Sequence, residues 1–142
     1  MSSYAGSAMP IRSLSRRRRT QPTNAELEIL RVLWQRGSCT VREVHQLLDR
    51  STPVGYTTVL KLLQIMTEKG LVTRDASTRS HRYAAATAQD AAQRRMILDL
   101  AERAFGGSTV LLVLYALSTT PATTQGLANV RQLLDKIVGG TP

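Results

Sequence analysis

Apolar residues recur at helical spacing in three successive segments of the N-terminal half of the chain. The first segment follows Thr-Asn-Ala-Glu at residues 23–26, a capping box in which the Thr hydroxyl and the Glu carboxylate each accept a backbone N–H of the first turn. A second capping box, Thr-Val-Arg-Glu at residues 40–43, opens the second segment. We therefore predict a first helix that ends at Gly37, a short second helix, and a third helix from about Gly55 to Lys69.

The stretch after the third helix has the pattern of two short strands. Residues 71–75 and 81–84 flank a polar run at residues 76–80, which predicts a β-hairpin. Three helices followed by a hairpin are the outline of a winged helix-turn-helix, so we place this domain at residues 23–86.

The C-terminal part, residues 87–142, has apolar faces but no independent core. A third candidate capping box at residues 87–90 opens a predicted helix that runs to about Phe105, before Gly-Gly breaks the chain. The apolar run at residues 110–117 fits either a strand or a buried helix. A final amphipathic helix follows Pro121 and carries Leu127, Val130, Leu133, Leu134 and Ile137. We expect this tail to dimerise, and the alternative is that it folds back onto the first domain.

The overall prediction is a mainly α fold with a small β-hairpin, in which a winged helix-turn-helix is followed by a helical dimerisation tail. At 100° per residue, the third helix divides into two faces. The apolar face, expected in the core, holds Val59, Leu62, Leu63 and Met66. The opposite face holds Thr57, Lys61 and Gln64, flanked by Thr58 and Ile65. These side chains suit a major groove, although a solvated polar face is an equally ordinary explanation for one helix taken alone.

Basic residues near the third helix favour the DNA-binding interpretation. The predicted hairpin carries Arg74, Arg79, His81 and Arg82. Arg79 and His81 lie near its tip, where a wing would contact the DNA backbone or the minor groove. Arg42, near the start of the second helix, is a candidate phosphate contact. His45 is expected to be a partly buried residue of the second helix, and no cluster of metal-ligating residues accompanies His81.

The charge of the whole chain also points to an acidic partner. Its formal net charge is +9, and its pI is about 10.8. Residues 1–22 contain five Arg and no acidic residue, and we expect them to form a disordered basic arm. This arm either grips the DNA duplex through charge or results from a start codon placed too early, since Met9 offers another start.

Composition also excludes several classes of function. The single cysteine, Cys39, excludes an internal disulfide and a multi-cysteine metal site, as is usual in a reducing cytoplasm. No apolar run approaches the ~20 residues of a membrane span, so we expect a cytoplasmic protein without membrane insertion. No nucleophile–base pair, carboxylate pair or phosphate loop stands out. We therefore predict that the chain is not an enzyme and needs no cofactor.

With these features in view, the chain resembles the penicillinase repressor family, the BlaI/MecI type that includes copper-responsive repressors. The resemblance covers roughly residues 23–138. Its matching stretches are residues 23–30 with Leu33-Trp34, Thr40 to Val44, Tyr56 to Lys61, Glu68 to Val72, Arg82-Tyr83, and Ala104 to Ser108. Several separate matches in the same order are far more specific than any one of them.

This resemblance implies a homodimeric repressor of a palindromic operator in double-stranded DNA. Its third helix, beginning near Tyr56, would enter the major groove, and residues 110–117 would form a helix at the dimer interface. The implied interface residues are Ile97, Leu100, Phe105, Leu111, Leu112, Leu114, Tyr115, Leu133, Leu134 and Ile137. A membrane-bound sensor protease is an implied partner.

The chain departs from the family pattern at three places. Tyr115-Ala116 stands where proteolysed members have the Asn-Phe bond that is cut, which puts induction by cleavage in doubt. The tail lacks the paired Cys-x-Cys motifs of the copper-responsive branch, which argues against release by metal. Ile65-Met66 replaces a frequent Arg-Leu pair, so an altered operator sequence is expected. An interaction adaptor and a non-specific nucleic-acid-binding protein are the alternative functions.

Overall fold

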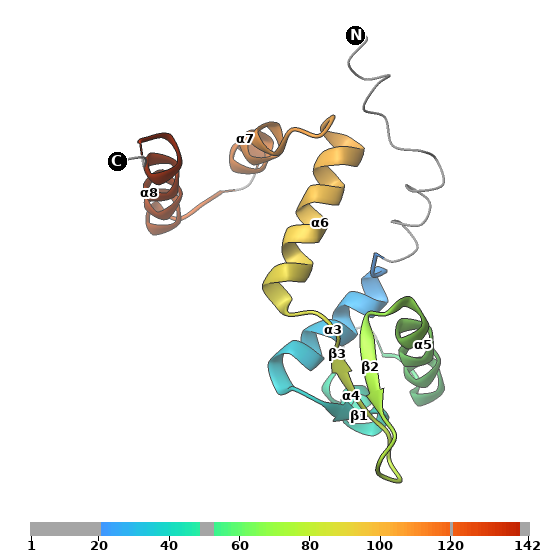
Figure 1. Ribbon diagram of the computed structural model, residues 1–142. Coiled ribbons are helices and arrows are strands. Elements are labelled where there is room, and N and C mark those ends of the chain that lie inside the picture. The colour runs from blue at the N-terminus through green and yellow to red at the C-terminus, as the bar shows by residue number, and fades with distance from the viewer. Residues whose placement is uncertain (1–20, 49–52, 120, 140–142) are drawn as a thin grey trace. The chain divides into compact units, whose positions relative to one another are not determined.

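The computed structural model describes residues 21–48, 53–119 and 121–139, and these form helices with one small sheet (Figure 1). The elements are α3 (Asn24–Arg36), β1 (Cys39–Thr40), α4 (Val41–Leu47), α5 (Tyr56–Lys69), β2 (Val72–Asp75), β3 (Arg82–Ala85), α6 (Gln89–Ala104), α7 (Thr109–Thr119) and α8 (Thr124–Gly139). The chain divides into two compact units at Arg94–Arg95. The predicted basic arm at residues 1–22 lies almost entirely outside the described residues.

Both N-terminal capping boxes are present, and they explain where α3 and α4 begin. The Thr23 hydroxyl accepts the Glu26 amide at 3.2 Å, while the Glu26 carboxylate accepts the Thr23 amide at 2.9 Å. Thr40 and Glu43 repeat this arrangement at 3.2 and 2.8 Å. Each box satisfies two backbone donors that the first helical turn leaves without a partner, as the sequence predicts.

The third predicted capping box is displaced, because α6 begins one residue later than that motif requires. The Ala92 amide donates to the Ala88 carbonyl at 3.0 Å, which puts Ala88 at the N-cap position. The carbonyl of Thr87 instead accepts the indole N–H of Trp34 at 3.0 Å. This hydrogen bond holds the segment after β3 against α3, so long-range contact overrides the local capping signal.

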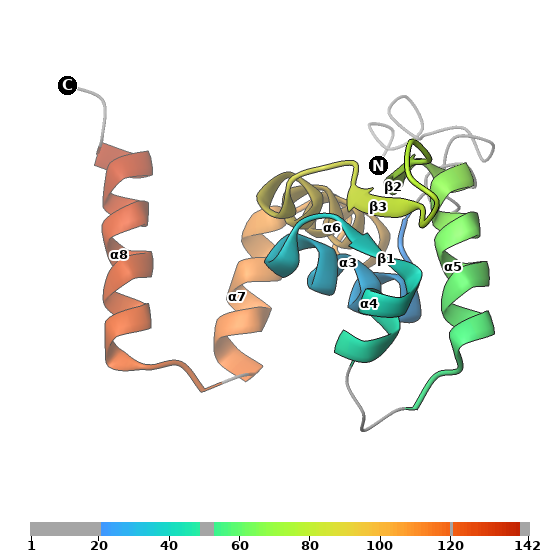
Figure 2. The ribbon, with the colours of Figure 1, turned by 90° about the horizontal axis from the view of Figure 1, so that it is seen from below.

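The predicted hairpin is present, and it belongs to a three-stranded antiparallel sheet of order β1-β3-β2. The sequence did not indicate β1, whose two residues pair with the outer edge of β3 at Cys39↔Tyr83 and Thr40↔Arg82. A strand of two residues is too short to show an alternation of apolar and polar side chains, and Thr40 also serves as the N-cap of α4. Figure 2 shows the sheet together with α3, α4 and α5 in the first unit.

The core of the first unit is mainly aliphatic and joins its helices to the sheet. Its fully buried side chains include Ile29 of α3, Val44 of α4 and Tyr83 of β3, together with one face of α5. A charged contact lies at its edge, where the Lys69 ammonium is 2.7 Å from the Glu26 carboxylate. This ion pair joins the end of α5 to the start of α3.

The apolar run at residues 110–117 is helical and lies within α7, which decides between the strand and the helix left open by the sequence. Two residues with positive φ separate α6 from α7, namely Gly106 at 59° and Gly107 at 87°. The Gly107 amide donates to the Ala101 carbonyl at 2.8 Å, and this hydrogen bond closes the end of α6. None of the described residues in α7 or α8 is buried.

Candidate nucleic-acid interface

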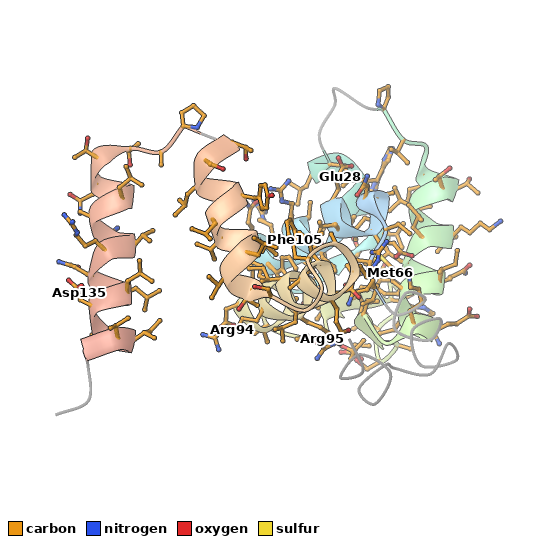
Figure 3. The ribbon with its side chains drawn as sticks, turned by 90° about the horizontal axis from the view of Figure 1, so that it is seen from above. Glu28, Met66, Arg94, Arg95, Phe105 and Asp135 are labelled. Atoms are coloured by element: carbon orange, nitrogen blue, oxygen red, sulfur yellow. The ribbon has the colours of Figure 1, made fainter. Side chains whose placement is uncertain are left out.

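The two faces of α5 differ in the way its sequence predicts. Val59, Leu63 and Met66 are fully buried, and Leu62 packs against the core while remaining partly exposed. Met66 is labelled in Figure 3. The opposite face is exposed at Thr57, Thr58, Lys61, Gln64 and Ile65, and Tyr56 and Glu68 of the same helix are also exposed. The unit therefore anchors α5 by its apolar stripe and presents hydroxyl, amide and ammonium groups to solvent.

A cleft lies beside this helix, between the start of α4, the start of α5 and the tip of the hairpin. The charged and aromatic side chains that line it and are exposed to solvent are Arg42 of α4, Tyr56 of α5, and Arg79 and His81 of the hairpin. All four of these side chains are exposed, and Tyr56 retains 48% of its surface. The structure thus brings residues that are far apart in the sequence to one concave surface with positive charge.

The hairpin turn that carries Arg79 and His81 is shaped by a local hydrogen bond. The Ser77 amide donates to the Asp75 carboxylate at 2.9 Å, an Asx-type turn directly after β2. This hydrogen bond lowers the pKa of Asp75. In Figure 1 the turn projects beyond β1 and α4, as a wing does.

Arg82 differs from Arg79 at the hairpin tip, because its guanidinium is engaged within the protein. It donates to the Ser38 carbonyl at 2.7 Å and to the Ser38 hydroxyl at 3.2 Å, and it lies 3.4 Å from the Glu43 carboxylate. Tyr83, the next residue of β3, is buried in the core, and alternate side chains of a strand point to opposite faces. Arg82 therefore links β3 to the segment before α4 and does not line the cleft formed by Arg42 and Arg79.

Glu43 combines this ion pair with its role as a helix cap. The hydrogen bond from the Thr40 backbone amide lowers the pKa of the Glu43 carboxyl, and the nearby Arg82 charge acts in the same direction. By contrast, burial raises the pKa of the Cys39 thiol, whose Sγ lies 3.6 Å from the Gly37 carbonyl. Cys39 is thus a neutral core residue, unsuited to nucleophilic or metal-binding chemistry.

His45 also contributes to the cleft, although sequence reasoning gave it no functional role. Its Nε2 lies 2.8 Å from the carbonyl of Val54, just before α5, and its ring meets that of Tyr56 edge to face. Ser80 lines the same cleft. The spacing of His45 on α4 predicts only partial burial, and no local pattern specifies its contact with Val54, nine residues further along the chain.

The second unit exposes an unusual amount of apolar surface. The implied interface residues that are exposed are Ile97, Leu100, Leu111, Leu114, Tyr115, Leu133, Leu134 and Ile137, while Phe105 and Leu112 are partly buried. Phe105 and Tyr115 lie together, with ring centroids 5.9 Å apart. An all-round apolar helix such as α7 is normally covered on every side.

The described residues contain no group of three or more His, Cys, Asp or Glu side chains placed to hold a metal ion. None of the helices in this part of the chain is both long enough and apolar enough to cross a membrane.

These elements define a winged helix-turn-helix protein of the kind found in transcriptional regulators. A family model described as "Penicillinase repressor" matches residues 22–136, and the chain belongs to this family. It is similar to the transcriptional regulator BlaI from two strains of Mycobacterium tuberculosis, with 34% identity over 91 residues. That alignment covers 63% of this chain and 66% of the relative, just under two thirds of its length.

Two solved structures resemble parts of the chain. One is the homodimeric winged helix-turn-helix DNA-binding domain of a possible ArsR-family transcriptional regulator from Mycobacterium bovis, with a TM-score of 0.47 and 22% identity. The matched region covers 65% of this chain and 80% of the Mycobacterium bovis chain. The other is the YusO protein of Bacillus subtilis, with a TM-score of 0.46 and 19% identity. That match covers 90% of this chain and 82% of the YusO chain. At these TM-scores neither structure bears on the activity or assembly of this chain.

Proposed function

We propose that this chain is a transcriptional repressor that binds a palindromic operator as a homodimer. The observation that carries the proposal is the exposed polar face of α5 beside a cleft lined by Arg42, Arg79 and His81. A helix held firmly by its apolar stripe presents chemically varied side chains, and positive charge flanks it. This combination suits base reading by the helix and backbone binding by its surroundings.

The side chains of α5 have the chemistry that base recognition needs. Lys61 can donate to a guanine edge, and Gln64 can pair with the N6 and N7 groups of adenine. Thr57 and Thr58 can donate to a phosphate or contact a thymine methyl group. Glu68 is exposed nearer the end of the same helix, and its negative charge would repel phosphate. We therefore assign the reading surface to the first turns of α5, from Thr57 to Gln64.

Phosphate contacts would supply most of the affinity and make it dependent on salt. We assign these contacts to Arg42, Tyr56, Arg79 and His81, which line the cleft from three elements. Arg82 takes a different role in this proposal. Its bonds to Ser38 and Glu43 would hold the base of the wing, so it supports the interface without contacting DNA.

A second copy of the chain is the proposed cover for the exposed apolar faces of α7 and α8. These faces would be costly in water, because each buried apolar side chain contributes roughly 1.5–3 kcal/mol. A self-complementary interface between two copies has twofold symmetry, and a twofold-symmetric protein matches a palindromic operator. We leave a sensor protease out of the proposal, because Tyr115-Ala116 replaces the bond cut in proteolysed members of the family.

Selection from a library of random-sequence duplexes tests this function. The proposal predicts enrichment of a palindrome whose half-sites are centred about 10 base pairs apart, or a multiple of that distance. Enrichment of an isolated half-site would contradict the dimer. No enrichment despite measurable binding would contradict sequence recognition and favour a non-specific nucleic-acid-binding protein, while no binding at all would favour an interaction adaptor.

A further inference from the structure

We propose that His45 is a positioning residue for DNA recognition, which fixes the start of α5 by donating a hydrogen bond to the carbonyl of Val54. This inference rests on the proposed function, because it concerns the helix that we assign to base reading. His45 itself need not contact DNA. Its effect would pass through Val54 and Tyr56 to the reading surface.

The contact defines which ring nitrogen of His45 donates the hydrogen bond. The carbonyl oxygen of Val54 can only accept a hydrogen bond, so the Nε2 of His45, at 2.8 Å, must carry the hydrogen. The same ring lies edge to face against Tyr56, with centroids 6.0 Å apart and an interplanar angle of 80°. One side chain of α4 therefore contacts both the residue before the N-cap of α5 and the first residue of that helix.

The start of α5 has particular need of such a contact. α3 and α4 begin with complete capping boxes, whereas the N-cap of α5 is Gly55, which makes no side-chain capping hydrogen bond. Glycine also gives the backbone more freedom than any other residue. The first helical bond, from the Val59 amide to the Gly55 carbonyl, is 3.1 Å long. The position of this turn therefore depends on tertiary contacts, which include the burial of Val59 and the His45–Val54 hydrogen bond.

The first turn of α5 is also where accuracy matters for recognition. Tyr56, Thr57 and Thr58 lie in it, and Tyr56 shares the cleft with Arg42 and Arg79. Hydrogen bonds to bases weaken steeply with small errors of distance and angle. A loosened first turn would therefore lower the affinity for the correct sequence, while charge-driven binding to any duplex would persist.

Two substitutions separate the hydrogen bond from the ring contact. His45→Phe keeps an aromatic ring against Tyr56 but removes the donor, whereas His45→Gln removes the ring but keeps an N–H that can reach Val54. Two readouts are needed, both made on the full chain. One is amide hydrogen exchange at Val59, compared with the Gly37 amide at the end of α3. The other is fluorescence anisotropy with the duplex selected by the wild-type protein and with a scrambled duplex.

The expected results follow from the loss of one hydrogen bond, which corresponds to roughly 3–10-fold in an equilibrium constant. His45→Phe should speed exchange at Val59 by about that factor and leave exchange at Gly37 unchanged. It should weaken binding to the selected duplex by a similar factor and leave the scrambled duplex unaffected. His45→Gln should keep both the exchange rate at Val59 and the affinity for the selected duplex close to their wild-type values.

If the Val59 amide of His45→Phe exchanges at the same rate as in the wild-type protein, the inference is overturned, whatever the DNA results. Equal losses in the Phe and Gln variants would also overturn it, because the ring contact would then be the important one. If the wild-type protein shows no sequence preference, the proposed function fails, and the exchange experiment still decides whether His45 holds α5.

Discussion

The ion pair between Lys69 and Glu26 offers a quantitative test of how the winged-helix unit is held together. The Lys69 ammonium donates to the Glu26 carboxylate at 2.7 Å and to the Gln21 carbonyl at 3.0 Å. The same carboxylate oxygen accepts the Thr23 amide of the capping box. The Glu26 side chain is only 3% exposed and that of Lys69 is 18% exposed, so the carboxylate is the more deeply buried partner.

Lys69→Met removes the cation and leaves this buried carboxylate with only its backbone donor. Breaking a fully buried ion pair by removing one partner costs about 3–5 kcal/mol. Because Lys69 is partly exposed and Glu26 keeps the hydrogen bond from Thr23, we expect a loss of about 2–4 kcal/mol in the free energy of unfolding. The double variant Glu26→Gln/Lys69→Met removes both charges and should recover part of this loss.

A double-mutant cycle provides the assay. Urea unfolding of the wild type, both single variants and the double variant is followed by far-UV circular dichroism, at one fixed protein concentration because dimerisation adds to stability. We expect a coupling free energy of about 1–3 kcal/mol between the two positions. Effects that add to within about 0.5 kcal/mol would refute the argument, since they would mean that the two side chains contribute independently.

Three further predictions concern recognition, assembly and acid stability. Lys61→Ala should weaken binding to the selected duplex by about 1–3 kcal/mol if Lys61 reads a base, and an equal loss on scrambled DNA in anisotropy titrations would make it a phosphate contact only. Leu134→Glu places a charge on the apolar face of α8, so light scattering should show a monomer with unchanged helix content, and a persistent dimer would exclude this face from the interface. The lowered pKa of Glu43 means that its charged form stabilises the fold above its unfolded pKa, near 4.5, and that this contribution is lost as the pH falls through the lowered folded value. Glu43→Gln should therefore flatten the acid limb of stability against pH, and an unchanged limb in pH-dependent melting curves would contradict the assignment.

Much of the winged-helix unit could be predicted from local signals in the sequence. The capping boxes at Thr23 and Thr40 are complete within four residues, and the apolar stripe of α5 repeats over several turns. Both signals depend on spacing alone, which is why they predict the beginning of each helix and the buried face of α5. The family resemblance added what spacing left undecided, namely that the apolar run at residues 110–117 is helical.

The remaining features depend on contacts between distant parts of the chain. β1 is too short to show alternation, and it exists because β3 offers a free edge beside Cys39. α6 begins after Ala88, while the carbonyl of Thr87 accepts the indole N–H of Trp34. Arg82 could not be separated from Arg79 by sequence alone, because both are arginines of one hairpin. Only the structure shows that Arg82 binds Ser38 and Glu43.

The central claim is that the exposed face of α5, together with the cleft beside it, recognises a DNA sequence. The most direct test compares two duplexes over a range of salt concentrations. Fluorescence anisotropy would measure the affinity of the wild-type protein for its selected duplex and for a scrambled duplex of the same composition. We predict a preference of at least ~10³ at physiological salt, with both affinities falling steeply as salt rises. Equal affinities for the two duplexes at every salt concentration would contradict the account.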